Sequence, residues 1–284
     1  MLEFIMNTLS IAAPILSAVF TFVPESILPS FQVVTNDFLS WYEPLAGKAE
    51  DVNTILSRAV LVLAVWCFAA ILHLLHIILR TKTLIKGDNY HIVIQYGNLF
   101  KYRHGKKVVN FDECFTSTVG GKPNEVKPKS VCGQFLQKNA TIDVKRIVKN
   151  SGLKPNGYSK YKNTPSYESG RLVPYNDYLL MAFAKLNADG KGVFDSKKDY
   201  LRCLEVFWEE LDKYHGLEDV YIPVLGSGLT RFEGGSGKLI NTQEMLDLII
   251  WSYRLNSPKI KSPRCLHIVC RREKGFSLNK INKG

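Results

Sequence analysis

Two long uncharged segments near the N-terminus constrain this chain more than any other feature of its sequence. Residues 4–23 are 20 consecutive positions without Asp, Glu, Lys or Arg, and residues 59–79 are 21 more. Because a helix rises about 1.5 Å per residue and the hydrocarbon core of a bilayer is about 30 Å thick, roughly 20 apolar residues suffice to cross it. The sequence therefore predicts two membrane-spanning helices, at about 4–23 and 57–79, within a membrane region of residues 1–83.

A cleaved signal peptide is the competing interpretation of the first segment. Such a peptide has a cationic start and a short apolar core that ends in small residues. Here the only charge before the apolar run is Glu3, and the run is longer than a typical signal core. The segment contains Pro14, which membrane helices tolerate. We therefore expect this segment to be a span.

Charge predicts how the spans are oriented. Residues 1–79 carry two basic and six acidic side chains, a net charge of −4, whereas the remaining residues carry 35 basic and 20 acidic ones, a net charge of +15. Arg80, Lys82 and Lys86 directly follow the second span, so the positive-inside rule places the C-terminal part in the cytoplasm. The N-terminus then lies on the same side, and the acidic stretch 24–54 becomes the outward loop.

The strongly basic C-terminal part suggests an anionic partner. Nucleic acid, anionic lipid and a phosphate-bearing ligand are the candidates. No helix-turn-helix or RNP-type pattern occurs and the lysines are scattered, which argues against nucleic acid and favours a domain that lies near lipid. The six cysteines show no metal-ligand spacing, so we expect no metal site and free thiols in a reducing cytosol.

The residues after the spans alternate between strand-like and helix-like patterns. Short alternating or apolar runs predict strands, and apolar positions three and four apart predict helices. This alternation indicates an α/β layered domain over residues 88–284. The predicted strands are 90–95, 107–111, 175–186, 219–224 and 265–270, and the predicted helices are 133–139, 196–214, with Ser196 as N-cap, and 239–255.

Two glycine-containing loops are the candidate ligand-binding elements. A predicted strand runs into the GSG sequence at 226–228 and a helix follows, an arrangement that exposes backbone N–H groups to phosphate. Residues 130–133 precede another predicted helix N-terminus, a site of the same kind. An ordinary strand-to-helix turn is the alternative. A P-loop is excluded, because Phe232 stands where its first glycine is needed and Leu239 where its Ser or Thr is needed.

The segments SVCGQF at 130–135 and YIPVLGSGLTRF at 221–232, with the strand YNDYLLMAFAKL between them, resemble a macro domain, the fold that binds ADP-ribose and related NAD derivatives. More closely, residues 88–272 resemble the macro-like domains that follow two transmembrane helices and are encoded beside TIR-domain proteins in bacterial antiphage systems of the Thoeris type. The resemblance implies a macro-like three-layer α/β domain with a mixed central sheet.

The resemblance also implies which residues bind the ligand. The loop at 226–231 corresponds to the phosphate and ribose loop, residues 130–134 to the first phosphate loop, and residues 112–116 to the segment near the distal ribose. Asn98 stands where many macro domains have an aspartate for the adenine amine, and its carbonyl can still accept a hydrogen bond. The implied ligand-binding residues are Gly226, Ser227, Gly228, Leu229, Thr230, Arg231, Ser130, Val131, Cys132, Gly133, Gln134, Asn98, Asp112 and Thr116.

A receptor rather than an enzyme is the function that the resemblance implies. In such systems a TIR enzyme converts NAD into an ADP-ribose-type signal, and the macro effector senses it and damages the membrane. The expected ligand is an ADP-ribose derivative such as a histidine conjugate, with no cofactor and no catalytic residue. The expected partners are the TIR-domain protein, lipid of the bacterial inner membrane and further copies of the chain that assemble on ligand binding. A membrane-anchored hydrolase of ADP-ribose conjugates and a plain anchor without a ligand are the alternatives.

Several side chains keep two interpretations. Arg231 either binds the diphosphate or ties its loop to Glu233 or to a helix end. Cys132 is more simply a packing residue than a nucleophile. His73 and His76 lie three apart in the second span, where they either line a pore or sit near the interface. One of four tyrosines is expected to stack on the base, and the others to pack: Tyr158, Tyr161, Tyr167 and Tyr175.

Overall fold

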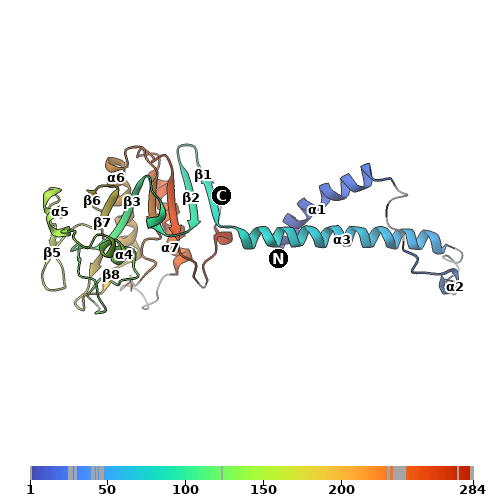
Figure 1. The fold of residues 1–284 in the computed structure, drawn as a ribbon, viewed down its shortest axis with the longest axis horizontal. Helices are drawn as coiled ribbons and strands as arrows, with labels where there is room; N and C mark the ends of the chain where they lie inside the picture. Colours follow the sequence, from blue (N-terminus) through green and yellow to red (C-terminus); the bar gives the residue numbers. More distant parts are fainter. Residues whose placement is uncertain are drawn as a thin grey trace. The chain divides into compact units, whose positions relative to one another are not determined.

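The computed structural model divides the chain into two compact units, Met1–Arg80 and Thr81–Gly284 (Figure 1). The structure describes residues 2–24, 28, 31–39, 42, 44, 48–122, 124–228, 231–232, 241–273 and 275–281. At positions 2, 3, 231 and 232 it describes the backbone alone.

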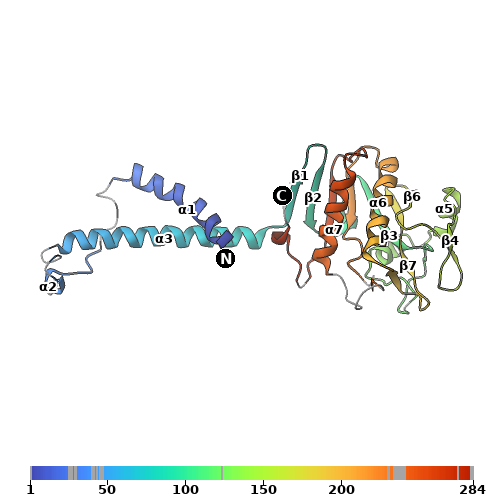
Figure 2. The same ribbon diagram turned by 180° about the vertical axis from the view of Figure 1, so that it is seen from behind.

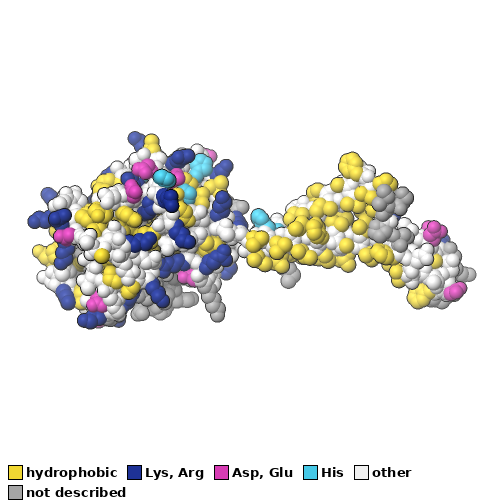
Figure 3. All heavy atoms as spheres, in the orientation of Figure 1, with side chains coloured by type: hydrophobic (Ala, Val, Ile, Leu, Met, Phe, Trp, Pro, Cys, Tyr) yellow, Lys and Arg dark blue, Asp and Glu magenta, His cyan; other side chains and the backbone are white. Residues whose placement is uncertain are grey.

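The first unit consists of α1 (Leu2–Phe22), the short α2 (Asn36–Leu39) and α3 (Ala49–Leu79). By length and composition α1 and α3 are able to cross a membrane, with mean hydropathies of 1.7 and 2.5 over their most apolar parts, and the two helices pack against each other. Their apolar side chains are nevertheless largely exposed, as the space-filling view shows (Figure 3). Helices that are apolar on nearly all sides and yet unburied suit lipid better than water. The two predicted apolar helices are confirmed.

α3 begins at Ala49, eight residues before the predicted start of the second span at about residue 57. The early start has a local cause, because the loop before α3 is hydrogen-bonded to its first turns. Asn53 Oδ1 accepts from the N–H groups of Val33 at 2.9 Å and Val34 at 2.8 Å, and Ser57 Oγ accepts from the N–H of Phe31 at 2.8 Å. Thirty-one residues make a helix about 46 Å long, which exceeds the roughly 30 Å of a hydrocarbon core.

The second unit is built on a nine-stranded mixed sheet of order β1-β2-β11-β9-β3-β7-β8-β10, with β6 also paired to β7. Five adjacent strands, β2, β11, β9, β3 and β7, run parallel. β1 is antiparallel to β2, β6 and β8 are antiparallel to β7, and β10 is parallel to β8. The bounds are β1 Lys82–Lys86, β2 His91–Tyr96, β3 Lys106–Asp112, β6 Leu172–Tyr175, β7 Tyr178–Leu186, β8 Gly192–Phe194, β9 Val220–Pro223, β10 Arg231–Phe232 and β11 Leu266–Cys270, with β4 Gly157–Tyr158 and β5 Pro165–Ser166 forming a separate hairpin.

Helices cover both faces of this sheet, which gives three layers. Successive residues of a strand point to opposite faces, so Val108 and Met181 contribute to one core while Val109 and Leu180 contribute to the other. The first core lies under α6 (Lys197–Tyr214) and α7 (Thr242–Asn256), and the second under α4 (Val131–Lys138) and α5 (Val144–Asn150). α4 lies in front of the sheet in Figure 1, and α7 in front of it in Figure 2. The predicted mixed sheet and layered α/β class are confirmed.

The element bounds differ from the predicted ones mainly at helix starts. Ser196 caps α6 as predicted, through the N–H of Asp199. α7 begins at Thr242 because Asn241 and Glu244 form a capping box there, and residues 239 and 240 lie outside the described part. The elements that were not predicted are the short 3-10 helices η3 (Leu99–Lys101) and η4 (Leu278–Lys280), the helices α2 and α5, and the strands β1, β4, β5, β6, β8 and β10.

A buried carboxylate fixes α6 to the sheet. Glu210, on the buried face of α6, accepts hydrogen bonds from Arg171 Nη1 at 3.0 Å, Lys213 Nζ at 2.6 Å and the N–H of Leu172 at 3.4 Å. Burial acts to raise the pKa of Glu210, but the hydrogen bonds from Lys213 and Leu172, together with the nearby positive charges, hold it below its ordinary value of 4.5. The ionised form is therefore the one that stabilises the fold.

We expect Glu210→Gln to lower the free energy of unfolding of the full chain by about 1–3 kcal/mol at pH 7, because the buried donors lose their charged acceptor. A folded-state pKa below the unfolded one makes this stabilisation complete above pH 4.5 and progressively lost as the pH falls further. Denaturant unfolding at pH 7 and pH 4 checks both points, with the exposed neighbour exchanged in Glu209→Gln as the matched control. An equal destabilisation at both pH values would contradict the charge argument.

Candidate functional site

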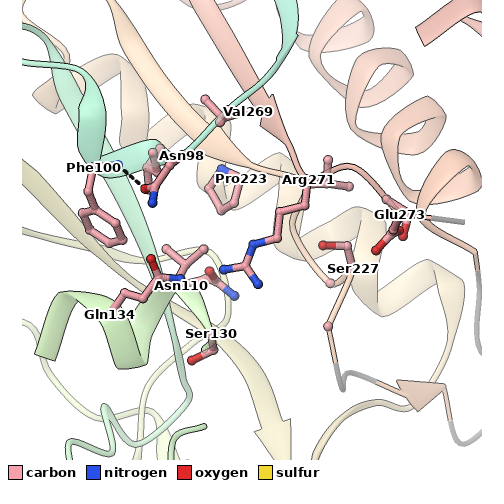
Figure 4. Close-up of a pocket in the computed structure, with 17 residues that line it drawn as sticks. Asn98, Phe100, Asn110, Ser130, Gln134, Pro223, Ser227, Val269, Arg271 and Glu273 are labelled. Atoms are coloured by element: carbon pink, nitrogen blue, oxygen red, sulfur yellow. Dashed lines mark hydrogen bonds between the residues drawn. The ribbon is translucent and has the colours of Figure 1, made fainter. Parts of the chain in front are cut away.

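A pocket of about 300 Å³ lies where the parallel strands end. The segments after β2, β11 and β9 meet β3 and the start of α4 around it (Figure 4). Ligands of α/β proteins bind outside the carboxyl ends of parallel strands, so its location is the expected one. The residues that line it are Gly97, Asn98, Leu99, Phe100, Asn110, Ser130, Val131, Gln134, Pro223, Val224, Gly226, Ser227, Gly228, Thr242, Val269, Arg271 and Glu273.

The loop after β9 forms one wall of the pocket. Gly226 has a φ of +86°, a conformation that only glycine adopts readily, and a Cβ there would lie 3.0 Å from Cε of Met245 in α7. The preceding carbonyl, that of Leu225, accepts a hydrogen bond from the buried hydroxyl of Tyr200 at 2.9 Å. These constraints fix the loop against α6 and α7, so that Ser227 and Gly228 border the pocket.

The N-terminus of α4 forms the facing wall. Ser130 is the N-cap: its Oγ accepts from the N–H of Gly133 at 3.0 Å and donates to the carbonyl of Lys127 at 2.7 Å. Gly133 is needed there because a Cβ would lie 2.2 Å from that same carbonyl oxygen. Val131 and Gln134 face the pocket, so the partial positive charge of the helix start is directed at it.

Asn98 follows β2 at the third wall. Its Oδ1 accepts from the N–H of Phe100 at 2.9 Å, which caps the short helix η3. The carbonyl that the sequence offered as an acceptor is thus already used locally, and Figure 4 shows the amide nitrogen turned toward the pocket. A hydrogen-bond donor is therefore the stronger feature of this position.

Asp112, Cys132 and Thr116 lie off the pocket. Asp112 and Cys132 border an adjoining cavity of about 340 Å³, which shares Ser130 and Gly228 with the first. Asp112 Oδ1 accepts from the N–H groups of Cys114 at 2.9 Å and of Thr116 at 3.0 Å, and burial, outweighing these bonds, raises its pKa. Burial also raises the pKa of the Cys132 thiol well above its ordinary value, which disfavours a nucleophilic thiolate.

The pocket also contains side chains that the sequence did not single out, and the two charged ones, Arg271 and Glu273, are among them. Arg271 follows β11, and its Nη2 donates to the carbonyl of Lys129 at 2.8 Å, so the guanidinium extends across the pocket toward the α4 wall (Figure 4). Asn110 on β3 and Glu273 after Arg271 also line it. The available signal was position, because each lies on or just after a predicted strand.

Other predicted features have mixed outcomes. Leu229, Thr230 and the side chain of Arg231 lie outside the described part of the chain. The aromatic ring in the pocket belongs to Phe100, and the four tyrosines proposed for stacking do not line it. The six cysteines are free, as predicted, and among the described residues no cluster of three or more His, Cys, Asp or Glu is arranged to hold a metal ion.

The sequence was compared with models of known families. The model described as Thoeris protein ThsA, Macro domain, matches residues 92–271. This chain belongs to that family. The match spans the sheet from β2 to β11 and all three walls of the pocket, so the predicted macro-domain fold is confirmed.

Individual relatives of this macro-domain chain are distant. It is 22% identical over 207 residues to Thoeris protein ThsA of Bacillus amyloliquefaciens, a match that covers 68% of this chain and 66% of that protein, just under two thirds. Among solved structures, the Oceanobacillus iheyensis macrodomain with ADP has 11% identity and a TM-score of 0.44, and covers 68% of this chain and 90% of that one. A mutant of that macrodomain with ADPR has 11% identity and a TM-score of 0.45, with coverages of 68% and 91%. The family assignment rests on the sequence match.

Gly133, buried in the first turn of α4, and Gly228, which lines the pocket, should differ in their response to an added methyl group. Gly133→Ala forces a Cβ onto a backbone carbonyl, so we expect the free energy of unfolding to fall by about 1–3 kcal/mol. A Cβ on Gly228 meets nothing within 4 Å, so Gly228→Ala should change the free energy of unfolding by less than about 0.5 kcal/mol. Denaturant unfolding of the two variants is the measurement, and equal effects would show that the α4 wall is not built on this close approach.

Proposed function

We propose that this chain is a membrane effector of a Thoeris-type antiphage system, and that its macro domain binds an ADP-ribose-type signal made from NAD by a TIR enzyme. The observation that carries the proposal is the pocket itself. Arg271, the start of α4 and the loop at 226–228 converge on a space of about 300 Å³ in a domain of the ThsA macro family.

A diphosphate suits this convergence of groups. A guanidinium matches phosphate oxygens with paired hydrogen bonds, and the N–H groups of a helix start and a glycine loop supply further donors. Gly228 leaves room for close approach, since open space lies where its Cβ would be. We assign the phosphates to the loops at 226–231 and 130–134.

The two ends of the ligand follow from this placement. The adenosine end lies toward Asn98 and Phe100, where an amide donor and an aromatic ring border the pocket. The distal ribose and any group attached to it, such as an amino acid, extend toward the adjoining cavity beside Asp112 and Cys132. The two cavities together are of the size that holds a drug-sized ligand.

We assign the chain a receptor role, and the chemistry of the pocket supports it. Ser130 uses its hydroxyl to hold the loop at Lys127, and burial raises the pKa of the Cys132 thiol, so neither is an activated nucleophile. A hydrolase of ADP-ribose conjugates is the second candidate. It is favoured by Asp112, whose raised pKa suits a general acid. Incubation of the purified chain with such conjugates decides between the two, because turnover would replace the receptor role.

The membrane region is the output of this receptor. Two exposed apolar helices followed by Arg80, Lys82 and Lys86 favour two spans, with both termini in the cytoplasm and residues 24–54 outside. Ligand binding is proposed to drive assembly of several copies, and the assembled spans then permeabilise the bacterial inner membrane. The ring centroids of His73 and Phe4 are 5.1 Å apart, so His73 lies at the contact between α3 and α1. His76 is exposed.

Arg271→Gln should weaken binding of ADP-ribose to the full chain in detergent about 10- to 100-fold, because a charge-assisted hydrogen bond to phosphate is lost. Isothermal titration calorimetry is the measurement. Arg272→Gln is the matched control, since Arg272 lies over the ring of Tyr96 at 4.8 Å instead of in the pocket and should stay within about twofold. Equal affinities of wild type and Arg271→Gln would place the diphosphate elsewhere.

Membrane damage is tested in cells that contain the chain and an active TIR enzyme. We expect membrane potential to collapse with the wild-type chain and to persist with Gly228→Val, whose side chain fills the pocket from a position with free space. Gly121→Val is the control, because Gly121 is exposed, also has nothing within 4 Å of its Cβ position, and lies outside the pocket. Stable polarisation with the wild-type chain while the signal is present would refute the effector role.

A further inference from the structure

The outer face of α7 carries an apolar stripe that a water-facing helix does not need. Leu248, Trp251 and Leu255 are spaced by three and four residues, so they share one side of the helix. Trp251 is 60% exposed and Leu255 70% exposed, while Leu248 is half-buried. α7 is in front of the sheet in Figure 2.

The exposed part of this stripe, Trp251 and Leu255, is separate from the side of α7 that packs into the domain, whereas Leu248 lies at the border and packs partly against the core. The inner side is completely covered, for example at Met245, Ile249 and Tyr253. Trp251 is the one exposed tryptophan among the described residues, and it is accompanied one turn later by an exposed leucine. Exposed apolar groups in such an arrangement mark interaction sites more often than exposed single residues do.

Charges beside the stripe identify what fits it. Asp247 and Arg254 lie seven residues apart on the same side of α7, one on each side of Trp251 along the helix. When two copies of such a helix pack antiparallel about Trp251, Asp247 of each copy lies beside Arg254 of the other, as flanking charges do in antiparallel coiled coils. Parallel packing would instead oppose like charges. The face is therefore complementary to itself.

We propose that α7 is the surface through which two copies of this chain pair, with the helices antiparallel and Trp251 at the two-fold axis. An isologous contact of this kind uses the same patch on both partners.

The small size of the stripe fits pairing in a membrane. A stable complex in solution needs about 1,200–2,000 Å² of buried surface, more than one helix face supplies. Copies that are held in one membrane in one orientation meet at a much higher effective concentration, so a weaker contact suffices. This step rests on the proposed function, which places the chain in a membrane.

α7 also connects this surface to the ligand pocket. Its first residue, Thr242, lines the pocket, and Met245 lies against Gly226 of the pocket loop. A ligand that contacts the start of α7 therefore contacts the same helix that carries the proposed pairing surface on its outer face.

Cross-linking of the full chain in liposomes, with and without ADP-ribose, tests the surface. We expect Trp251→Glu to weaken pairing about 30-fold, as loss of a central tryptophan does at other interfaces. Asp247→Arg and Arg254→Asp should each reduce cross-linking, and the double variant should restore it by exchanging the two charges. Leu217→Glu is the matched control, because it places the same charge on a 63% exposed leucine in the turn after α6.

Two outcomes would overturn the proposal. In the first, Trp251→Glu cross-links as much as the wild-type chain. In the second, the double variant cross-links no more than the weaker of the two single variants. Arg254→Asp also removes the hydrogen bond from Arg254 Nε to the Tyr90 hydroxyl, which is 3.0 Å long. The double variant lacks this bond too, so recovery of cross-linking in it shows that the single variants failed through lost pairing and not through loss of this bond. ADP-ribose titrations on the same proteins separate this idea from the proposed function. Pairing through α7 without ADP-ribose binding refutes the receptor alone, and binding without pairing refutes the surface alone.

Discussion

The parallel pairing of β2, β11, β9 and β3 is the constraint on which the pocket depends. Parallel strands must all end at the same edge of the sheet, so the chain leaves that edge four times within a short distance. Each exit contributes a different group: an amide at Asn98, a guanidinium at Arg271, a glycine loop at 226–228 and, at the last residue of β3, the carboxyl of Asp112, which borders the adjoining cavity. Helices on both faces keep these strands buried, and the ligand-binding groups are therefore confined to the exits.

Charge is distributed differently in the pocket and on the domain surface. The second unit is strongly basic, and Figure 3 shows Lys and Arg side chains scattered over the face in view. Among the lining residues that the structure describes, Arg271 and Glu273 carry a formal charge, and their signs are opposite. These described residues offer an anion mostly N–H groups and one guanidinium at short range. The surface lysines contribute a diffuse attraction that salt screens.

The sequence predicted those parts of the fold that have a local signal. β2, β3, β9, β11 and α6 follow from periodicity, and the loops around Ser130 and Gly226 follow from turn chemistry beside predicted helix starts. Arg271 and Asn110 could not be placed in the pocket, because nothing in the local sequence tells which strands are neighbours. β1 was missed since its pattern, Lys-Thr-Leu-Ile-Lys, is short and its two buried residues are Thr83 and Ile85. α5 depends on the Asp143 cap at a short, lysine-rich segment.

The hydrogen bonds that Asn53 and Ser57 accept from the preceding loop have a kinetic consequence for the membrane insertion that we propose. They satisfy backbone N–H groups that would otherwise need water, and they close the chain between α1 and α3 within the first unit. Helices joined in this way can be inserted as one preformed hairpin, so that neither has to cross alone. Insertion of α1, which is less apolar and contains Pro14, is helped most by this coupling. The more hydrophobic α3 supplies the greater part of the transfer free energy for both helices.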